Sequence, residues 1–328
     1  MKLLVDINIP ALRQPLRYTD KILLTGSCFT EHIADRLAQH HFRIVSNPNG
    51  ILFNPLSVAD SLSGYLQGRQ YQAEELFYLN ELWNSWDHHT RFSDIDRDTA
   101  LNRINRTQSE AGNMIREADW LIITLGSAFQ YYLREGGLPV ANNHRAPGQW
   151  FEKKLLTIEK ISSALSDMLT LLHEKNPKAR VLLTISPVRH IRDGVVDNNR
   201  SKARLIEAAH ELCSTFGFVH YFPSYELVID VLRDYRYYDI DLVHPNFAAT
   251  SYVWDTFMHT CIEEQTKQQM AAILELSIAQ KHRPRFAGTQ AHQDFCRKYA
   301  EKARELQYLH PYLDLSGPLA YFDDPLKE

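Results

Sequence analysis

The sequence predicts an α/β fold in which a mostly parallel sheet forms the middle layer of a three-layer sandwich. Several short apolar runs show no alternation with polar residues, which is typical of parallel strands buried on both faces. These runs alternate along the chain with longer segments whose apolar residues recur at helical spacing. Small and polar residues follow the apolar runs, at the edge of the sheet where open α/β proteins bind their ligands.

The first predicted strand is "KILLTG", residues 21–26, an apolar run that ends in glycine. A helix follows it, because Phe29, Ile33 and Leu37 repeat at helical spacing. "GILFNP", residues 50–55, is a short apolar piece between turn signals. The first strand therefore runs almost directly into the first helix.

The rest of the chain continues this alternation of strands and helices. The further predicted strands are residues 119–127, 179–188 and 217–224. The further predicted helices are residues 56–70, 97–118, 157–174, 199–216 and 225–234. From about residue 247 onward the pattern is helical. We therefore predict one α/β domain over residues 1–258, with an insertion at about 56–115, and a helical C-terminal extension over 259–328.

Length and charge exclude several classes of protein. A chain of 328 residues is long enough for a sizeable core. A net charge of −4 provides no basic field for nucleic acid. No apolar run reaches the roughly 18 residues of a membrane span, and the first residues lack the apolar stretch and cleavage site of a signal peptide. We expect a cytoplasmic protein that binds neither nucleic acid nor membrane.

The four cysteines are widely spaced and form no CxxC pair. This spacing argues against a structural zinc knuckle and against a disulfide scaffold. For most of them we expect a buried thiol that packs as a small apolar side chain. They are Cys28, Cys213, Cys261 and Cys296.

Asp241 and His244 in "DLVHP" have the spacing of a catalytic pair. A carboxylate three residues before a histidine can accept the Nδ1–H of its imidazole, which leaves Nε2 free to act as a base. For an isolated DxxH the alternative is a polar surface turn. A nucleophile early in the chain followed by a late Asp-x-x-His is a chain order that makes a triad.

Ser27 and Cys28 are the two candidate nucleophiles, side by side where the first strand meets the first helix. A cysteine at a helix N-terminus meets backbone N–H groups and the positive end of the helix dipole, which lower its pKa. A cysteine beside a histidine is a competent nucleophile. The alternatives are an inert buried thiol for Cys28 and a helix N-cap for Ser27.

Ordered motifs cover most of the chain. They are TGSCFT (25–30), GILFNP (50–55), HHTRFS (88–93), TLGSAFQY (124–131), ANNHR (141–145), SPVRHIRDG (186–194), NNRSKA (198–203), YFPSYE (221–226) and LRDYRYYDIDLVHP (232–245). This set resembles the GSCFA family, a branch of the SGNH/GDSL hydrolase superfamily. The resemblance implies a flavodoxin-like sheet that carries a Ser/Cys–His–Asp hydrolase arrangement.

The resemblance also implies which residue attacks. The first block of the superfamily is Gly-Asp-Ser, with the nucleophilic serine two residues after glycine. Aligned on that block, "Gly26-Ser27-Cys28" puts Cys28 at the nucleophile and Ser27 at the aspartate. The last block, Asp-x-x-His, falls on Asp241 and His244. We predict Cys28 as the nucleophile, with Ser27 as the alternative.

The oxyanion hole implied by the resemblance is only partly present. Gly50 can stand for the glycine that donates its N–H, but "Gly126-Ser127-Ala128" has alanine where the superfamily has asparagine. Either Ser127, Asn54 or Asn142 supplies the third donor, or the hole is incomplete. The loss of one such donor costs about 100- to 1000-fold in rate. A slow enzyme or a protein that only binds is therefore a second hypothesis.

Five histidines are candidate ligands of a metal ion. His88, His89, His144, His190 and His244 could meet in space, and histidine is the commonest metal ligand. Adjacent histidines in a strand point apart, however, and the sequence has no HExxH pattern. We predict no metal and no cofactor.

The remaining candidate site residues lie in the motifs that follow or flank strand ends. We expect them to line the same cleft as the nucleophile and to bind substrate, with Arg189 as the arginine kept for an anionic group. They are Asn54, Asn142, His144, Ser186, Arg189 and His190.

These features together predict an SGNH-like hydrolase or acyltransferase that acts on an ester or thioester, with a carbohydrate ester as one candidate substrate. A thiol nucleophile favours acyl transfer through a thioester, so transferase chemistry competes with hydrolysis. The alternative is a catalytically inactive protein that binds a carbohydrate or an anion on the same scaffold. The expected partner is a small-molecule or glycan ester.

Overall fold

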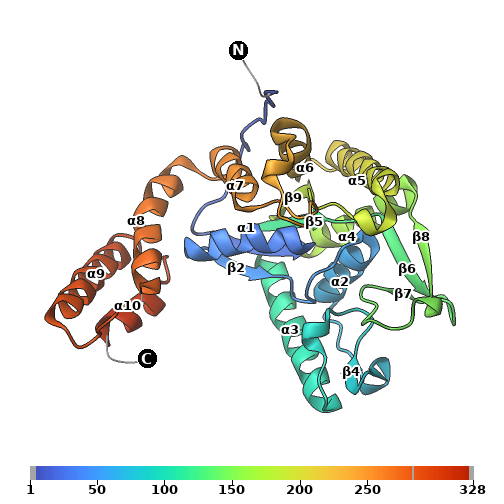
Figure 1. The fold of residues 1–328 in the computed structure, drawn as a ribbon, viewed down its shortest axis with the longest axis horizontal. Helices are drawn as coiled ribbons and strands as arrows, with labels where there is room; N and C mark the ends of the chain where they lie inside the picture. The colour runs from blue at the N-terminus through green and yellow to red at the C-terminus, as the bar shows by residue number, and fades with distance from the viewer. Residues whose placement is uncertain (1–4, 283, 325–328) are drawn as a thin grey trace. The chain divides into compact units, whose positions relative to one another are not determined.

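The computed structural model describes residues 5–282 and 284–324 and contains a mostly parallel five-stranded sheet (Figure 1). Its strands are β1 (Lys21–Gly26), β2 (Arg43–Ser46), β5 (Trp120–Leu125), β9 (Arg180–Ile185) and β10 (Val219–Phe222). They are ordered β10-β9-β5-β1-β2, and the pairs β1–β5, β5–β9 and β9–β10 are parallel. Numbered along the chain this is the order 2-1-3-4-5 of flavodoxin-like sheets. The predicted α/β fold is confirmed.

Both faces of this sheet are buried, as the continuous apolar strands require. Leu23, Ile123 and Leu183 point to one face and share a core with helices on that side. Because side chains alternate along a strand, Ile22 and Ile122 point to the other face, and both are at most 2% exposed. The helices that contribute to the first core are α2 (Pro55–Gln67), α3 (Arg97–Glu117), α4 (Ile158–Lys175) and α5 (Val195–Thr215).

The structure contains strands that the sequence pattern did not predict. β2 was missed because it is a short strand with no fully buried residue. Two small antiparallel sheets were missed because their strands are short and rich in polar and aromatic residues. They are β3 (Phe77–Leu79) with β4 (Leu82–Asn84), and β6 (Phe129–Leu133) with β7 (Pro139–Val140) and β8 (Phe151–Leu155).

The segment after β10 departs from the single helix predicted there. It forms a three-residue turn, α6 (Ser224–Glu226), and then a π-helix, η5 (Leu227–Leu232). The short 3-10 helices of the chain are η1 (Ala73–Glu75), η2 (Thr90–Phe92), η3 (Gly148–Trp150), η4 (Ile191–Asp193) and η6 (Tyr235–Tyr237).

Gly26 makes the turn between β1 and helix α1 (Cys28–Gln39). Its φ of +138° is one that other residues rarely adopt, and a Cβ at this position would lie 2.1 Å from the carbonyl oxygen of Thr124. Its N–H donates to Oδ1 of Asn47 at 2.9 Å. A glycine is therefore required for β1 to lie against β5 and deliver the next residues to the sheet edge.

The chain divides into two compact units. The first contains four strands of the sheet, β1, β5, β9 and β10, and extends to Thr256. The second contains Phe257 onward together with Pro10–Asp20 and Asp35–Ile44, two segments from within the range predicted as the α/β domain. In the second unit the Oγ of Ser277 donates to the carbonyl oxygen of Gln39. The C-terminal helices are α7 (Phe247–Cys261), α8 (Glu264–Lys281), α9 (Gln290–Leu309) and α10 (Ser316–Asp323).

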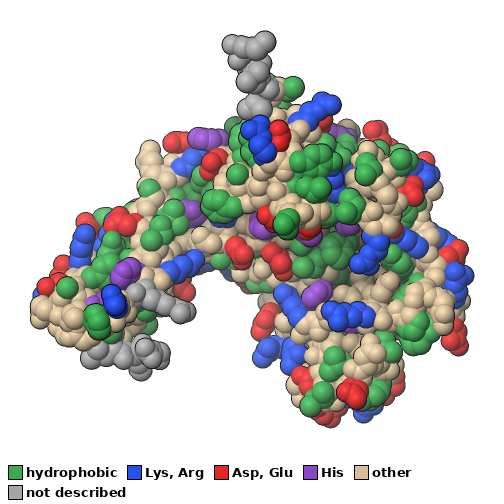
Figure 2. Space-filling model, viewed as in Figure 1, with side chains coloured by type: hydrophobic (Ala, Val, Ile, Leu, Met, Phe, Trp, Pro, Cys, Tyr) green, Lys and Arg blue, Asp and Glu red, His purple; other side chains and the backbone are tan. Residues whose placement is uncertain are grey.

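Acidic and basic side chains are interspersed on the face of the molecule shown in Figure 2. Among residues 5–282 and 284–324, every helix is too short or too polar to cross a bilayer.

Candidate active site

The site is built where β1, β5 and β9 end. The N–H of Ser27 donates to the carbonyl oxygen of Thr124 at 3.0 Å, and the N–H of Ser186 donates to that of Leu125 at 2.9 Å. A Cβ on Gly126 would lie 3.1 Å from the Cβ of Ser27. The three strand ends are therefore side by side. The order of the sheet reverses between β1 and β5, which is where such folds open a ligand crevice.

The two candidate nucleophiles differ in exposure. Ser27 is 1% exposed, and its Oγ has no hydrogen-bond partner among the described residues, so it does not cap α1. Cys28 is the first residue of α1 and is partly exposed. A substrate would therefore reach the thiol of Cys28 more readily than the hydroxyl of Ser27.

The electrostatic setting of Cys28 differs from the one predicted. Burial raises the pKa of its thiol above the ordinary value, and the carboxylate of Glu31 raises it further. The Lys202 ammonium and the N–H groups of Cys28 and Phe29 lower the pKa, but by less than burial raises it. The lowered pKa expected from the helix N-terminus is therefore not observed, because desolvation of the thiolate outweighs the dipole.

Asp241 and His244 form the predicted hydrogen-bonded pair. The Nδ1 of His244 lies 2.6 Å from Oδ2 of Asp241, and Oδ1 accepts the N–H groups of Val243 and His244. The hydrogen bond from His244 is the largest of the effects that lower the pKa of Asp241, to about 2. Leu242 has a φ of +59°, which turns the chain back so that the two side chains meet. The carboxylate is thus ionised and orients the imidazole.

The Asp241–His244 loop is attached to the segment that follows β9. The N–H of Arg189 donates to the carbonyl oxygen of Val243 at 3.2 Å. Nε2 of His244 makes no hydrogen bond to the described residues, and none joins His244 to Ser27 or Cys28. The pair is about half exposed, with side-chain exposures of 46% for Asp241 and 48% for His244.

Lys202 is a residue of this region that we did not predict from the sequence. It is 1% exposed on α5, and its Nζ donates to the carbonyl oxygens of Gly126 and Ser186, both at 2.6 Å. It interacts electrostatically with Cys28. Its signal in the sequence is its position in the apolar stripe of α5, three residues before Leu205, where a lysine is unexpected.

His190 shares the carbonyl oxygen of Gly126 with Lys202. Its Nε2 lies 3.1 Å from that oxygen, and its N–H donates to Oδ1 of Asn198 at 2.9 Å. Burial, and then the charge of Lys202, lower the pKa of His190 to about 4. The imidazole is therefore neutral near pH 7. Of the predicted site residues, His190 and Ser186 lie in the same region as Ser27 and Cys28. We call Ser27, Cys28, Ser186, His190 and Lys202 the sheet-edge cluster.

Local hydrogen bonds engage two of the predicted oxyanion donors, the N–H of Gly50 and the side-chain amide of Asn54. The N–H of Gly50 donates to the carbonyl oxygen of Asn47 at 2.7 Å. Asn54 caps α2, with Oδ1 accepting the N–H of Ser57 at 2.8 Å, and its Nδ2 donates to the Oγ of Ser57 at 3.0 Å. The Oγ of Ser127 accepts the N–H of Phe129 at 3.2 Å, which leaves the Ser127 hydroxyl proton to donate. The N–H of Gly50 would have to leave Asn47 before it could bind an oxyanion.

Arg189 lies over two tyrosine rings. Its guanidinium carbon is 5.3 Å from the ring centre of Tyr235 and 4.9 Å from that of Tyr238, and Nη1 donates to the Tyr235 hydroxyl at 3.0 Å. These contacts fix the side chain by cation–π interaction. Its predicted role toward an anionic group stays a prediction.

A family model covers most of the chain. The model of the GSCFA family matches residues 21–257, the range that contains the sheet edge and the Asp241–His244 loop. The chain belongs to the GSCFA family. A second model, described as the GSCFA domain protein C-terminal domain, matches residues 273–328. Among curated proteins, none matches this GSCFA chain.

Two solved structures are distantly similar to the GSCFA chain. One is a protein from Streptococcus pneumonia assigned provisionally as a platelet activating factor, with 14% identity and a TM-score of 0.38 over 73% of this chain and 83% of that one. The other is an acetyl xylan esterase from the rumen bacterium Butyrivibrio proteoclasticus, with 14% identity and a TM-score of 0.30 over 66% of this chain and 57% of that one. At these identities and TM-scores, neither similarity assigns an activity to this chain.

A second group of polar residues gathers around His88, and it includes the motif residue His144. Nδ1 of His88 is 2.8 Å from the Oγ of Ser85, and Nε2 of His88 is 3.3 Å from Nε2 of Gln108. Gln108 also donates to Oδ1 of Asn49 at 2.6 Å. His144 joins through its Nε2, which donates to the carbonyl oxygen of Ser85 at 2.7 Å. We call Asn49, Ser85, His88, Gln108 and His144 the histidine network.

Two of the predicted site residues, Asn142 and His144, belong with the histidine network and not with the cluster around Cys28. Oδ1 of Asn142 accepts the N–H of His144, whose φ is +48°. Neither residue is hydrogen-bonded to the cluster around Cys28 in the described part of the chain. Among these described residues, no three His, Cys, Asp or Glu side chains gather in the manner of a metal site.

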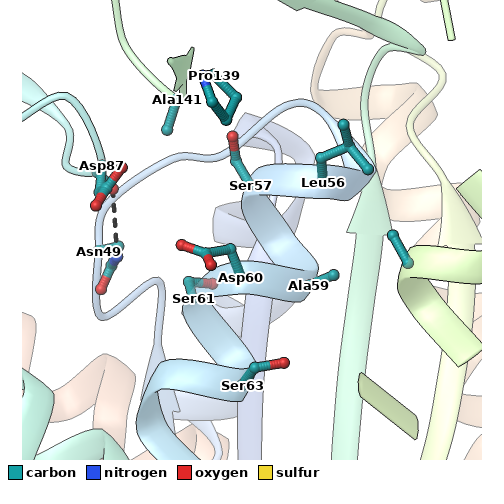
Figure 3. A pocket seen from close by; sticks show the side chains of 11 residues that line it. Asn49, Leu56, Ser57, Ala59, Asp60, Ser61, Ser63, Asp87, Pro139 and Ala141 are labelled. Atoms are coloured by element: carbon teal, nitrogen blue, oxygen red, sulfur yellow. Dashed lines mark hydrogen bonds between the residues drawn. The ribbon is translucent and has the colours of Figure 1, made fainter. Parts of the chain in front are cut away.

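A polar cavity of about 310 Å³ lies along α2 (Figure 3). Ser57, Asp60 and Ser61 of the helix line one side, and Asn49 and Asp87, joined by a hydrogen bond, line another. None of the predicted catalytic residues lines it. This cavity is therefore separate from the cleft predicted at the sheet edge.

Proposed function

We propose that this GSCFA protein is an acyl-transfer enzyme, a hydrolase or acyltransferase that acts on an ester or thioester. Cys28 is the nucleophile, His244 the base and Asp241 the group that orients it. The observation that carries the proposal is the 2.6 Å contact between Asp241 and Nδ1 of His244, which leaves Nε2 free. Supporting it, β1 carries Cys28 to the end of the sheet, and the Asp241–His244 loop is bonded to the segment after β9.

The proposed reaction follows from these groups. The Sγ of Cys28 attacks the carbonyl carbon of the substrate while its proton passes to Nε2 of His244. The tetrahedral intermediate collapses, the bond to the leaving group breaks, and His244 protonates the leaving alcohol or thiol. A thioester remains on Cys28. Water or an acceptor alcohol, deprotonated by His244, then attacks the thioester, and the thiol is regenerated with release of the acid or the new ester.

The N-terminus of α1 offers the oxyanion donors in this proposal. The N–H groups of Cys28 and Phe29 approach the Cys28 sulfur and have no carbonyl partner within the helix. Such donors act together with the positive end of the helix dipole on a developing oxyanion. They replace the Gly50 N–H, which is bonded to Asn47.

A binding protein without catalysis is the second candidate function. The observation that favours it is that two of the predicted oxyanion donors, the N–H of Gly50 and the side-chain amide of Asn54, already donate to local acceptors. The raised pKa of Cys28 also reduces the fraction of thiolate near neutral pH. A carbohydrate or anion would then bind at the sheet edge without turnover.

Turnover of a nitrophenyl acetate ester and of an acyl thioester separates these candidates. We expect the wild type to turn over one of them, and Cys28→Ala to lose about 1000-fold or more of that rate. Ser27→Ala is the matched control, since it removes the neighbouring hydroxyl and leaves the thiol. Peptide mass spectrometry on rapidly quenched protein should find the acyl group on Cys28. A wild type with neither turnover nor an acyl adduct would establish the binding protein instead.

A further inference from the structure

A small cavity with two arginines in its wall lies beside the Asp241–His244 loop. The N–H of Arg189 donates to the carbonyl oxygen of Val243 at 3.2 Å, and the backbone of Tyr238 is bridged to that of Pro245, the residue after His244. The cavity therefore adjoins the loop that carries the proposed base. Its polar lining residues are Arg189, Arg233, Asp234, Tyr235 and Tyr238.

The hydroxyl of Tyr238 is a buried donor without an acceptor. Tyr238 is 7% exposed, and its hydroxyl oxygen has no hydrogen-bond partner among the described residues. The Arg189 guanidinium, 4.9 Å from the centre of the Tyr238 ring, can only donate, so it provides no acceptor for the hydroxyl proton. A buried polar group without a partner costs free energy, and an acceptor placed in the cavity would remove that cost.

Arg189 is held in place with most of its donors available. Its guanidinium lies over the rings of Tyr235 and Tyr238, and Nη1 donates to the Tyr235 hydroxyl at 3.0 Å. A guanidinium has five N–H donors in a planar fork, and stacking on the two rings fixes the plane of that fork. Such an arrangement is suited to a planar oxyanion, which a guanidinium binds through two parallel hydrogen bonds.

The charge of the cavity is positive. Its acidic lining residue, Asp234, is engaged by Arg236, whose Nε lies 3.1 Å from Oδ1 and whose N–H donates to the same oxygen at 2.8 Å. These hydrogen bonds lower the pKa of Asp234, so its carboxylate is ionised and paired near pH 7. No Asp or Glu of residues 5–282 and 284–324 forms an ion pair with Arg189 or Arg233. An anion would compensate these two charges.

Size and charge together identify the ligand. The volume of about 40 Å³ has room for about three water-sized groups, which is the size of a carboxylate. We infer that the cavity is a subsite for a carboxylate group of the substrate, held by the Arg189 guanidinium and the Tyr238 hydroxyl, with Arg233 contributing charge. The assignment of this carboxylate to a substrate rests on the proposed function. The binding of a carboxylate can be measured without turnover.

Titration with acetate tests the subsite directly. In protein with labelled arginine, the Nε–H resonance of Arg189 is identified by its absence from Arg189→Lys. At constant ionic strength we expect acetate to shift this resonance in a saturable manner. Acetamide, which has a similar shape and no charge, is the matched probe and should leave the resonance unchanged. Equal responses to the two probes, or no response to acetate, would overturn the inference.

Tyr238→Phe removes one hydroxyl that no described residue binds. We expect the acetate dissociation constant to rise about tenfold, the effect of one hydrogen bond to a charged group, without a fall in the free energy of unfolding. Tyr237→Phe is the matched control, because Tyr237 does not line the cavity, and it should bind acetate as the wild type does. An unchanged affinity in Tyr238→Phe would contradict the proposed role of its hydroxyl.

Arg233→Gln tests the contribution of charge. We expect the acetate dissociation constant to rise several-fold, since one of the two uncompensated cations is removed. Arg192→Gln is the control: Arg192 is an exposed arginine of the segment after β9, and it does not line the cavity. Equal weakening by the two substitutions would show that acetate responds to the net charge of the protein and would overturn the subsite.

Turnover of carboxylated esters tests whether the ligand is part of the substrate. Mono-nitrophenyl succinate carries a carboxylate on its acyl part, and the acetate ester of a hydroxynitrobenzoate carries one on its leaving group. We expect one of them to exceed nitrophenyl acetate about tenfold in kcat/KM, and Tyr238→Phe to lose that advantage through KM. If neither exceeds it, the carboxylate does not belong to the substrate. Acetate binding in a protein that turns over none of the three esters would refute the proposed function alone.

Discussion

The sheet-edge cluster around Cys28 and the histidine network both contain motif residues, yet they differ in how their polar groups are used. In the histidine network most donors and acceptors meet each other: Gln108 bonds both Asn49 and His88, and His88 bonds Ser85, while Nδ1 of His144 has no partner among the described residues. At the sheet edge and in the Asp241–His244 loop, some polar groups have no hydrogen-bond partner. Nε2 of His244 and the Oγ of Ser27 have no partner in the described chain.

This difference separates residues that hold the fold from residues available to a ligand. A buried polar network whose members satisfy one another makes the core rigid and specific. A buried group without a partner, such as the Ser27 hydroxyl, costs free energy unless a ligand completes it, whereas the half-exposed Nε2 of His244 is open to solvent or to a substrate. Motif residues alone do not distinguish the two, because both regions carry them. The comparison can be tested by removing one group at a time from each side.

The largest effect is expected at His244. His244→Ala should lower ester or thioester turnover by about 1000-fold, within the range of general acid–base catalysis, with little change in the free energy of unfolding because the side chain is half exposed. His144→Gln in the histidine network should lower the free energy of unfolding and keep most of the turnover per folded molecule. Both variants are compared by steady-state kinetics and by urea denaturation. Equal loss of turnover in the two would erase the distinction between the regions.

Gly26→Ala tests how closely β1 and β5 pack at the sheet edge. The new Cβ would overlap the Thr124 carbonyl oxygen, 2.1 Å away, at a φ that alanine rarely adopts. We expect a loss of about 3 kcal/mol or more in the free energy of unfolding, measured with urea. Gly217→Ala is the control, because nothing lies within 4 Å of its Cβ position, and it should change stability by less than about 0.5 kcal/mol. A Gly26→Ala protein of normal stability would mean that β1 and β5 do not pack so closely.

The smallest effect is the pH dependence that His88 gives to stability. Burial lowers the pKa of His88 from 6.5 to about 3, so the unfolded chain takes up a proton at a pH where the folded chain does not. The contribution of neutral His88 to the free energy of unfolding is fully present above pH 6.5 and is lost as the pH falls toward 3. At pH 5 the loss is about 2 kcal/mol. The free energies of unfolding at pH 7.5 and pH 5 should differ less in His88→Gln than in the wild type. Parallel pH profiles would show that His88 is not held neutral.

Local sequence determined most elements of the fold and one hydrogen-bonded Asp–His pair. The strands β1, β5, β9 and β10 were predicted because a short, mostly apolar run without regular alternation is typical of a strand in a sheet covered on both faces. Asp241 and His244 were predicted because three residues of chain are enough to bring a carboxylate to an imidazole. Such features depend on neighbours in sequence, so the sequence is sufficient to find them.

Tertiary structure decided which motif residues share a site. Asn142 and His144 were expected with Cys28, but they belong with the histidine network, since the chain from β6 to β8 carries them there. The N–H of Gly50 was expected to be free, but a turn consumes it. The pKa of Cys28 was expected to fall with the helix dipole, but it rises because of burial, which no local pattern states.

Lys202 shows most clearly where sequence stops and structure begins. By itself the sequence determined an α/β sheet, a thiol at the end of its first strand and an Asp–His pair near the end of the domain. Only the folded chain brings a lysine of α5 to the carbonyl oxygens of Gly126 and Ser186 and within the field of Cys28. The physical reason is that hydrophobic periodicity acts over a few residues, whereas desolvation and charge pairing act through space, between side chains that the strand order alone brings together.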